Sequence, residues 1–283
     1  EDKSGVKVAA DRFDSRMQTL PREDFPALPE SPGKAKAVLS REGLREMVAK
    51  TQFAITGEDT RFFLNGALFV LRTDSMSLVA TDGHRLALVT VKRPTADDSI
   101  PAGEEVKVIL PKKTLLELGK LLSESEGDIT YERGENHLFF DVGGRVLISR
   151  MIDGQFPAYE RVIPKGNDKK IEFERERLTS AIKRVALLSN ERSRAVKFET
   201  SKGRVDVTSS SSEFGEAKEQ LPVDYTGDAM AISFNAQYVL DFLNAVGSDV
   251  VSLSLKDEVS QAVLRPVGEQ SYDYTYVIMP MRI

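Results

Sequence analysis

The residues best placed for chemistry are Asp82 and His84, in the run Thr81-Asp82-Gly83-His84-Arg85-Leu86. A carboxylate and an imidazole this close could be drawn as the general-base pair of a hydrolase. An orienting carboxylate usually reaches its histidine across the fold, however, and no nucleophilic serine or cysteine motif accompanies this pair. The competing interpretation is a turn, because Gly83 supplies a positive φ at no steric cost. We favour the turn and keep the hydrolase as the weaker alternative.

Other catalytic and ligand-binding patterns are missing from the sequence. It contains no cysteine, no phosphate-binding G-x-x-x-x-G-K-[ST] loop, and no acidic cluster at metal-ligand spacing. Gly143-Gly144 is instead typical of a hairpin turn. We therefore expect no catalytic residue, no metal site and no cofactor.

The composition is that of an ordinary globular protein, with 41% hydrophobic and 29% charged residues in a chain of 283. No apolar run approaches the roughly 20 residues that span a bilayer, so we expect a cytoplasmic protein without a membrane partner. The formal net charge of −5 argues against coating nucleic acid through bulk electrostatics. It leaves room for a local basic surface.

The longest-range feature is an internal repeat with a spacing near 131 to 134 residues. Ser15-Arg16-Met17 and Phe25-Pro26-Ala27 recur as Ser149-Arg150-Met151 and Phe156-Pro157-Ala158. A period of this length corresponds to a whole domain and not to a solenoid unit. The predicted divisions are 1–33, as the C-terminal remnant of an earlier copy, 34–162 and 163–283.

Within each complete copy, apolar patterning predicts a strand, a helix and three strands, and then the same order again. Ser40 fits an N-cap, and Leu115, Leu118 and Leu122 line one helical face after Pro111. The predicted fold class is α+β, with tandem domains that each carry two helices packed on antiparallel sheets. We expect the helices on one face and water on the other. Strands are expected at 6–10, 15–19, 37–39, 62–64, 68–72, 77–82, 85–91, 128–133, 137–142, 145–151 and 171–173, and helices at 40–53, after Pro111, at 174–189 and at 235–246.

Basic residues recur on the predicted helices at spacings that place them on one face. Arg41 and Arg45 lie four residues apart, and Lys113 and Lys120 lie seven apart. Glutamates are mixed with them, as on any solvated amphipathic helix, and the helix at 235–246 carries no Lys or Arg. The pattern alone therefore leaves both a solvated face and a nucleic-acid face open. The candidate DNA-facing residues are Arg41, Arg45, Lys112, Lys113, Lys120, Arg177, Lys183 and Arg184.

The C-terminal run is apolar and ends in Met279-Pro280-Met281-Arg282-Ile283. A terminus this apolar frays into water unless it docks. Two methionines beside a proline make an adaptable surface of the kind that binds varied short peptides. A last strand that completes a core explains Val277 and Ile278, but it explains the methionines less well.

Four ordered motifs carry a resemblance to a known family: 61–66 (RFFLNG), 79–87 (VATDGHRLA), 153–157 (DGQFP) and 276–282 (YVIMPMR). On these motifs the chain resembles the bacterial DNA polymerase III beta subunit, the DNA sliding clamp, over essentially its whole length. In that family three such domains form a protomer, and two protomers close into a ring around duplex DNA with helices lining the hole. The resemblance implies a non-catalytic processivity factor at the nucleoid. The implied partners are duplex DNA, the DNA polymerase III alpha subunit, the clamp loader and other proteins that carry the clamp-binding motif.

The sequence departs from the family at its start, where only the last strands of a first domain remain. We therefore expect this chain to be a monomer that cannot close a ring, whereas the full-length protein forms a homodimer. By resemblance, Leu187 and Leu188 lie at the dimer interface. A peptide-binding adaptor without a DNA role stays open as an alternative.

The resemblance also implies a peptide-docking groove between the second and third domains. Its apolar floor suits a leucine or phenylalanine anchor, and its arginines supply a polar rim. The implied groove residues are Arg61, Phe63, Leu64, Thr81, Gly83, His84, Arg85, Leu86, Pro157, Arg161, Val162, Asn235, Tyr238, Val259, Gln261, Val277, Met279, Pro280, Met281 and Arg282.

Overall fold

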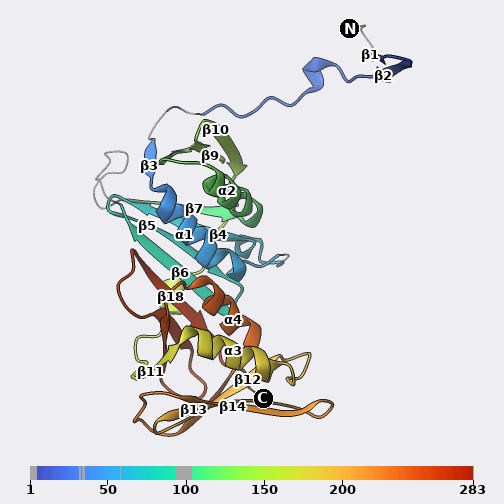
Figure 1. The fold of residues 1–283 in the computed structure, drawn as a ribbon. Helices are drawn as coiled ribbons and strands as arrows, with labels where there is room; N and C mark the ends of the chain where they lie inside the picture. The colour runs from blue at the N-terminus through green and yellow to red at the C-terminus, as the bar shows by residue number, and fades with distance from the viewer. Residues whose placement is uncertain (1–4, 32, 34–35, 58, 94–103, 283) are drawn as a thin grey trace.

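The computed structural model describes residues 5–31, 33, 36–57, 59–93 and 104–282. It begins with a hairpin of β1 (Gly5–Ala10) and β2 (Phe13–Gln18), as the strand pattern predicts. Figure 1 shows this hairpin apart from the rest of the chain, joined to it by an extended segment. No helix in the described ranges is both long and apolar enough to cross a bilayer.

The first complete copy follows the predicted order of strand, helix and three strands, twice over. The Ser40 hydroxyl accepts from the Gly43 N–H at 3.2 Å and caps the first helix, which confirms the predicted N-cap. Its elements are β3 (Ala37–Leu39), α1 (Arg41–Thr51), β4 (Gly66–Arg72), β5 (Ser75–Thr81), β6 (Arg85–Lys92), β7 (Glu105–Pro111), α2 (Lys112–Glu124), β8 (Ile129–Arg133), β9 (His137–Val142) and β10 (Arg145–Arg150).

The second copy repeats that order with its own capped helix. The side-chain oxygen Oδ1 of Asn235 accepts from the N–H groups of Gln237 and Tyr238 at 2.9 and 3.3 Å. Its elements are β11 (Lys169–Glu174), α3 (Arg175–Ala186), β12 (Ala195–Ser201), β13 (Arg204–Ser211), β14 (Gly215–Pro222), β15 (Met230–Asn235), α4 (Ala236–Ala245), β16 (Val250–Leu255), β17 (Ala262–Pro266) and β18 (Tyr272–Ile278).

One sheet runs through both copies. Its strand order is β11-β16-β17-β18-β6-β5-β4-β7, and all its pairs are antiparallel. The two copies meet where β18 pairs with β6, from Tyr272 opposite Val91 to Ile278 opposite Arg85. Two four-stranded sheets, β10-β9-β8-β3 and β14-β13-β12-β15, flank it. Residues more than 180 positions apart in sequence are therefore hydrogen-bonded neighbours.

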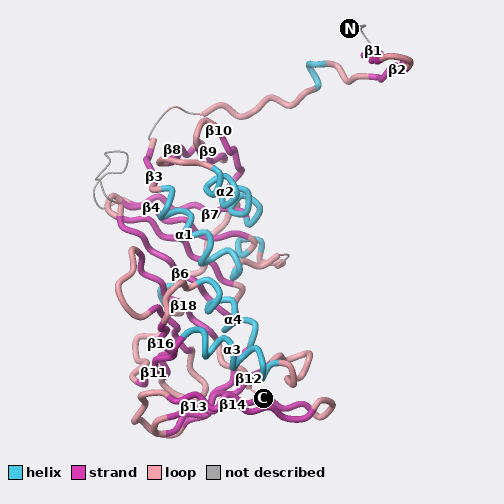
Figure 2. The backbone as a smooth tube through the Cα atoms, viewed as in Figure 1, coloured by secondary structure: helices cyan, strands magenta, loops and turns pink. Residues whose placement is uncertain are grey.

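All four helices of the described chain lie on one side of the sheets, as Figure 2 shows. Helix α1 contacts both α2 and α4, and α4 contacts α3, so the helices form a continuous row. The large apolar core lies between this row and the sheets, and it includes Leu115, Leu118 and Leu122, as predicted.

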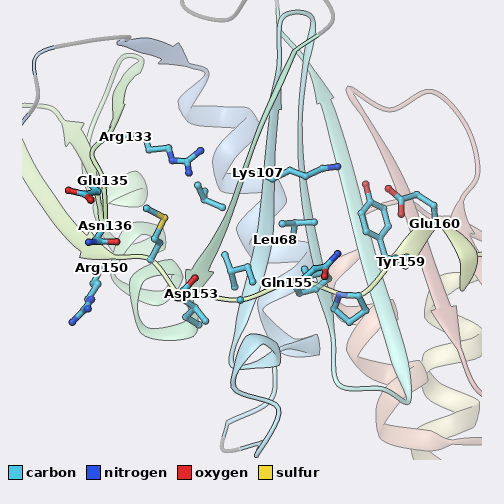
Figure 3. Close-up of a pocket in the computed structure, with 18 residues that line it drawn as sticks. Leu68, Lys107, Arg133, Glu135, Asn136, Arg150, Asp153, Gln155, Tyr159 and Glu160 are labelled. Carbon is cyan, nitrogen blue, oxygen red and sulfur yellow. The ribbon is translucent and has the colours of Figure 1, made fainter.

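The opposite face of the central sheet is partly covered, which partly corrects the expectation from patterning, although Glu172 and Arg265 on that face are exposed. A second apolar cluster covers it, in which Phe156 and Tyr159 pack with Leu68, Leu86 and Val277. The covering residues come from the segment after β10, which crosses the outer face of the sheet. Between this segment and β7 the structure leaves a cavity of about 590 Å³ (Figure 3).

Other local expectations are partly corrected. Phe62–Leu64 is a 3₁₀ turn and not a strand, since Leu64 N–H bonds to the Arg61 carbonyl. Pro111 precedes the first turn of α2, at the N-cap position and without a side-chain capping bond, and α3 ends at Ala186, with Leu187 as its C-cap. The predicted hairpin turn is confirmed, because Gly143 and Gly144 have φ of 60° and 81°.

Candidate functional site

The turn between β5 and β6 is held by its own side chains. The Asp82 carboxylate accepts from the backbone N–H groups of His84 and Arg85 at 2.9 and 3.0 Å. Gly83 has φ of +89°, the conformation that glycine permits, and its N–H bonds to the Thr81 hydroxyl at 3.1 Å. The sequence therefore dictates a rigid turn at this point.

That geometry does not form a general-base pair. Asp82 is occupied by backbone donors and by Arg85, and among the described residues no hydrogen bond or ion pair joins the His84 ring to a carboxylate. The His84 ring lies beside Tyr238 of α4 instead, with centroids 6.4 Å apart and planes 27° apart. The described residues also contain no group of three acidic or histidine side chains suited to a metal ion.

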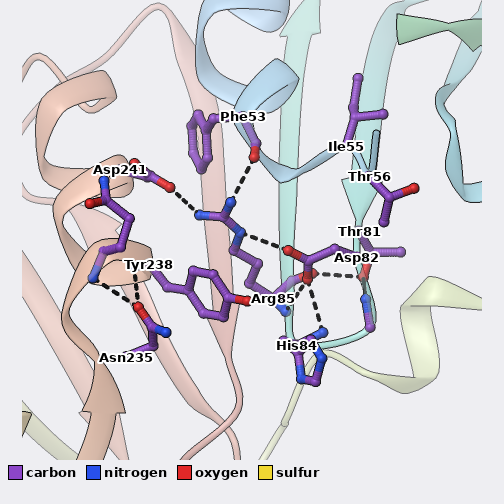
Figure 4. A network of polar contacts seen from close by, with 12 residues as sticks. Phe53, Ile55, Thr56, Thr81, Asp82, His84, Arg85, Asn235, Tyr238 and Asp241 are labelled. Carbon is purple, nitrogen blue, oxygen red and sulfur yellow. Dashed lines mark hydrogen bonds and ion pairs between the residues drawn. The ribbon is translucent and has the colours of Figure 1, made fainter. Parts of the chain in front are cut away.

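Arg85 joins the two copies at the turn (Figure 4). Its guanidinium bonds to Asp82 at 3.0 Å and to the Phe53 carbonyl at 2.7 Å, and it forms an ion pair with Asp241 of α4. It also lies 4.3 Å from the ring centroid of Tyr238, a cation–π contact. The side chain is only 9% exposed, so its charge is almost fully removed from water.

Burial alone lowers the pKa of Arg85, but Tyr276 and the carboxylates of Asp241 and Asp82 outweigh it and raise the pKa above its usual value. For the neutral Tyr276 hydroxyl, burial has the opposite effect and raises the pKa, although the neighbouring Arg85 opposes that shift. Arg85 is therefore a permanent cation, and the Tyr276 hydroxyl stays protonated and donates to the Tyr238 carbonyl at 2.8 Å. This network fixes the turn against α4.

The C-terminal segment docks beside the same turn. Met279 N–H donates to the His84 carbonyl at 2.9 Å, and Met281 N–H donates to the Ser233 carbonyl of β15 at 2.7 Å. Val277 and Ile278 are buried, whereas Met279 is 39% exposed. The apolar terminus thus docks along the surface and does not fray; Ile283 is outside the described residues.

Some residues of the predicted apolar floor are buried beneath the surface, and others are exposed on it. Leu64, Leu86 and Val277 are buried in the second apolar cluster, with Phe63 packed against it, so they support the surface from below. The exposed apolar side chains among the predicted groove residues include Val162 at 38% and Val259 at 64%.

Arg61 lies over the turn from its own loop. An added Cβ on Gly83 would stand 3.3 Å from an Arg61 guanidinium nitrogen, which is closer than nearly all real contacts. Arg61 donates to Asp59 at 3.0 and 2.7 Å, and these side-chain bonds lower the pKa of Asp59 to about 2. Arg61 is thereby held beside Gly83.

The remaining predicted residues lie on neighbouring segments, and the structure does not bond them to the turn. The backbone carbonyl of Gln261 accepts from the Asn167 amide at 3.0 Å, and the Val259 N–H bonds to Asp257 at 3.0 Å. Among the described residues, no hydrogen bond or ion pair ties the following to the turn: Pro157, Arg161, Val162, Asn235, Pro280 and Arg282.

Sequence reasoning missed Asp241 and Phe53, which complete the Arg85 network. Tyr238 and Asp241 are three residues apart on α4, a spacing that places both on one helix face. The sequence could therefore have paired Tyr238 with Asp241. It could not have identified Arg85 as their common partner, because Arg85 lies in the other copy.

The candidate DNA-facing residues lie on three of the four helices, and most carry a local partner. Lys120 pairs with Glu117 at 3.0 Å, and Arg177 pairs with Glu174 at 3.1 Å. Lys112 donates to the Ile55 carbonyl at 3.0 Å and is half-buried, so it is less available than the sequence suggests. Further partners are Glu42 for Arg41 and Arg45, the Leu122 carbonyl for Arg41, and Glu219 for Arg184. In the described part of the chain, Lys113 and Lys183 form no ion pair.

The predicted interface leucines stand just beyond α3. Leu187 is 77% exposed and Leu188 is half-buried, with the Leu188 N–H bonded to the Val185 carbonyl at 3.2 Å. An exposed leucine of this size at a helix end is compatible with a protein contact.

Comparison with known proteins gives consistent results. Residues 38–158 match the family described as DNA polymerase III beta subunit, central domain, and residues 160–282 match its C-terminal domain. The beta sliding clamp of Pseudomonas putida is 38% identical over 283 residues, covering all of this chain and 75% of the relative. That of Escherichia coli K12 is 36% identical over 281 residues, covering 98% and 73%. The crystal structure of the Pseudomonas aeruginosa sliding clamp superposes with a TM-score of 0.87 at 35% identity, covering all of this chain and 75% of that one.

Proposed function

This chain belongs to the DNA polymerase III beta subunit family of DNA sliding clamps, and we propose that it tethers replication and repair proteins to duplex DNA by docking their short linear peptides. The observation that carries the proposal is the single sheet through both copies with the four α-helices of the described chain on one side. Such a layout separates a helical face for DNA from a sheet face for proteins. We assign it no catalytic step, and we place its work on DNA in the cytoplasm.

The helical row is proposed to face DNA without reading its sequence. Contacts to phosphates alone position a protein on the duplex, and weak ones permit sliding. Reversing Lys113, Lys120, Arg177 and Arg184 to glutamate should weaken DNA binding and make its salt dependence shallower. Fluorescence anisotropy at several salt concentrations measures both. If the substituted protein bound DNA as well as the parent, the helical row would not be the DNA side.

The surface at the Thr81–Arg85 turn is proposed to dock the peptides. It combines the exposed Met279 with Val162 and Val259 above a buried apolar support. A peptide of the Gln-Leu-x-Leu-Phe type should bind near micromolar Kd, about −8 kcal/mol. That value suits a short flexible ligand that loses conformational entropy on binding.

Deletion of residues 279–283 tests this assignment by calorimetric titration. It removes Met279 and the two backbone bonds that hold the segment, and it should cost about 2 kcal/mol or more, the scale of a hot-spot loss. His84→Ala should weaken binding only modestly, because the turn is fixed by Asp82 and not by the imidazole. Undiminished affinity after the deletion would place the peptide elsewhere.

We further propose that the polymerase alpha subunit and the clamp loader are among the docked partners. Leu187 and Leu188 are proposed to contact another protomer, since Leu187 is largely exposed. The boundaries 34–162 and 163–283 are proposed as the two complete domains.

A further inference from the structure

The edge strand β7 is open along part of its length. Its inner side pairs with β4 from Glu105 opposite Arg72 to Pro111 opposite Gly66. On its outer side the structure shows one bridge, in which the Ile152 N–H donates to the Ile109 carbonyl at 3.0 Å. Because backbone groups in an antiparallel strand alternate sides, Lys107 points its N–H and carbonyl the same way as Ile109. Among the described residues these two groups of Lys107 have no partner.

The open edge borders the cavity of about 590 Å³, within the size range of ligand sites. Figure 3 shows Lys107 at one wall, the turn at Glu135 and Asn136 at another, and the segment through Asp153 and Gln155 along the bottom. The floor is apolar, since Leu68, Ile109 and Phe156 are each at least nine-tenths buried. Lining charges are balanced between Lys107, Arg133 and Arg150 on one side and Glu135, Asp153 and Glu160 on the other.

These features select the kind of ligand. Balanced charges give no preference for an acidic or a basic molecule. Unpaired backbone groups beside an apolar floor instead suit an extended polypeptide, which gains main-chain hydrogen bonds from an open strand and seats alternate side chains. Lys107, which lines the cavity, forms an ion pair with Glu105 of the same strand.

The cavity shares one residue and one apolar support with the surface proposed for peptide docking. Pro157 lines the cavity and is also one of the predicted docking residues. The segment passes over the 3₁₀ turn, where a Cβ on Gly154 would lie 3.2 Å from the Phe62 ring. Leu68 and Ile109 under the cavity share one apolar cluster with Leu86 under the docking turn.

We infer that the open edge of β7 accepts one extended segment of a partner protein, which continues the peptide docked at the Thr81–Arg85 turn and adds to the sheet beside Lys107. The inference rests on the proposed peptide docking. Its ligand is a strand-forming sequence of alternating polar and apolar residues, recognised by its main chain.

Calorimetric titration of the full chain with three peptides tests this. The core peptide is Gln-Leu-Asp-Leu-Phe, and the others add Thr-Ile-Thr-Val-Thr to its N-terminus or its C-terminus. One extended peptide should bind roughly tenfold tighter than the core, as expected for one or two main-chain hydrogen bonds. In that complex alone, hydrogen exchange of the Lys107 amide should slow.

Lys107→Pro removes the outward N–H at an edge position where proline is tolerated. It should reduce the extended peptide to the affinity of the core peptide and leave the core affinity unchanged. Lys107→Gln, which keeps the N–H and removes the charge, should behave like the parent. Should Lys107→Pro fail to fold, Asn136→Trp supplies the same test, because its exposed side chain would fill the mouth of the cavity.

The outcomes separate the inference from the proposed function. Core binding without any gain from either extension, or equal exchange of the Lys107 amide in all complexes, overturns the inference and leaves peptide docking intact. Loss of core binding itself would count against the docking proposal.

Discussion

Replacing Arg85 by methionine should destabilise the joint between the two copies more than any other single loss of charge at the Thr81–Arg85 turn. Methionine keeps much of the side-chain volume and leaves Asp82 and Asp241 without their common cation. Those carboxylates are 16% and 19% exposed, so water can only partly replace the guanidinium. Removing one partner of a buried ion pair typically costs 3–5 kcal/mol.

The low end of that range applies to Arg85→Met. Asp82 keeps its two backbone donors, and both carboxylates retain some contact with water. A loss of about 3 kcal/mol corresponds to a fall in Tm of about 6–12 °C in a chain of this size. Asp241→Asn should cost only about 1 kcal/mol, because Arg85 still bonds to Asp82 and to the Phe53 carbonyl.

Thermal unfolding followed by circular dichroism measures these effects, with Arg177→Met as the matched control. Arg177 also pairs with a glutamate, but the two side chains are 63% and 60% exposed, so its loss should cost less than about 1 kcal/mol. In the double variant, Asp241→Asn should add almost nothing to Arg85→Met. If Arg85→Met cost no more than Arg177→Met, the network at the joint would not stabilise it.

Two further predictions concern the carboxylate that holds the linker and the packing of the helical row. Glu132 accepts from Ser31, Lys36 and Gly33, and these contacts, led by the Ser31 hydroxyl, lower its pKa. Since the folded pKa lies below the unfolded one, the stabilisation is complete above about pH 4.3 and is lost as the pH falls through the folded pKa. Glu132→Gln should therefore be less stable than the parent at pH 7 in urea unfolding, and the difference should disappear as the pH falls below the folded pKa of Glu132. A difference in stability that stays constant with pH would contradict the assignment. Gly43→Ala should destabilise by about 1–3 kcal/mol, because its Cβ would stand 2.6 Å from the Met76 methyl group and 2.9 Å from Val91. Gly119→Ala, whose Cβ would meet Val48 at an ordinary 3.5 Å, should instead stabilise α2 by up to about 1 kcal/mol, and equal effects at the two glycines would contradict this view of the packing.

The sequence was sufficient for the elements that carry their own periodicity. The strand from His137 to Val142 has the predicted bounds, and the helix after Pro111 buries its predicted leucines. The turn at Gly83 was also predictable, because its side-chain and glycine requirements are local. Family membership, first suggested by four short motifs, is confirmed by the matches to both domains.

Features set by distant neighbours were not predictable in this way. Phe62–Leu64 has the composition of a strand, but it turns because Asn65 binds Thr56 at 2.8 Å and the Asp59 N–H at 2.9 Å, which closes the loop around it. Burial of the outer sheet face requires knowing that Phe156 returns across β4 and β6. A period of two in one strand says which residues share a face, but it does not say what covers that face.

The repeat explains why the open edge of β7 and the docked C-terminal segment have related geometry. In the first copy, Ile152 after β10 donates to the outward carbonyl of Ile109 in β7. In the second copy, Met281 after β18 donates to the Ser233 carbonyl of β15, the strand equivalent to β7. Each copy therefore fastens the segment after its last strand to the same edge by one backbone bond. In the second copy the Ala231 N–H, on the same side of β15 as Ser233, bonds to the Glu258 carboxylate at 3.3 Å, whereas the equivalent groups of Lys107 in the first copy have no partner among the described residues. In the first copy the chain then crosses the sheet and leaves a cavity beside this edge, the site that we propose for a single extended strand.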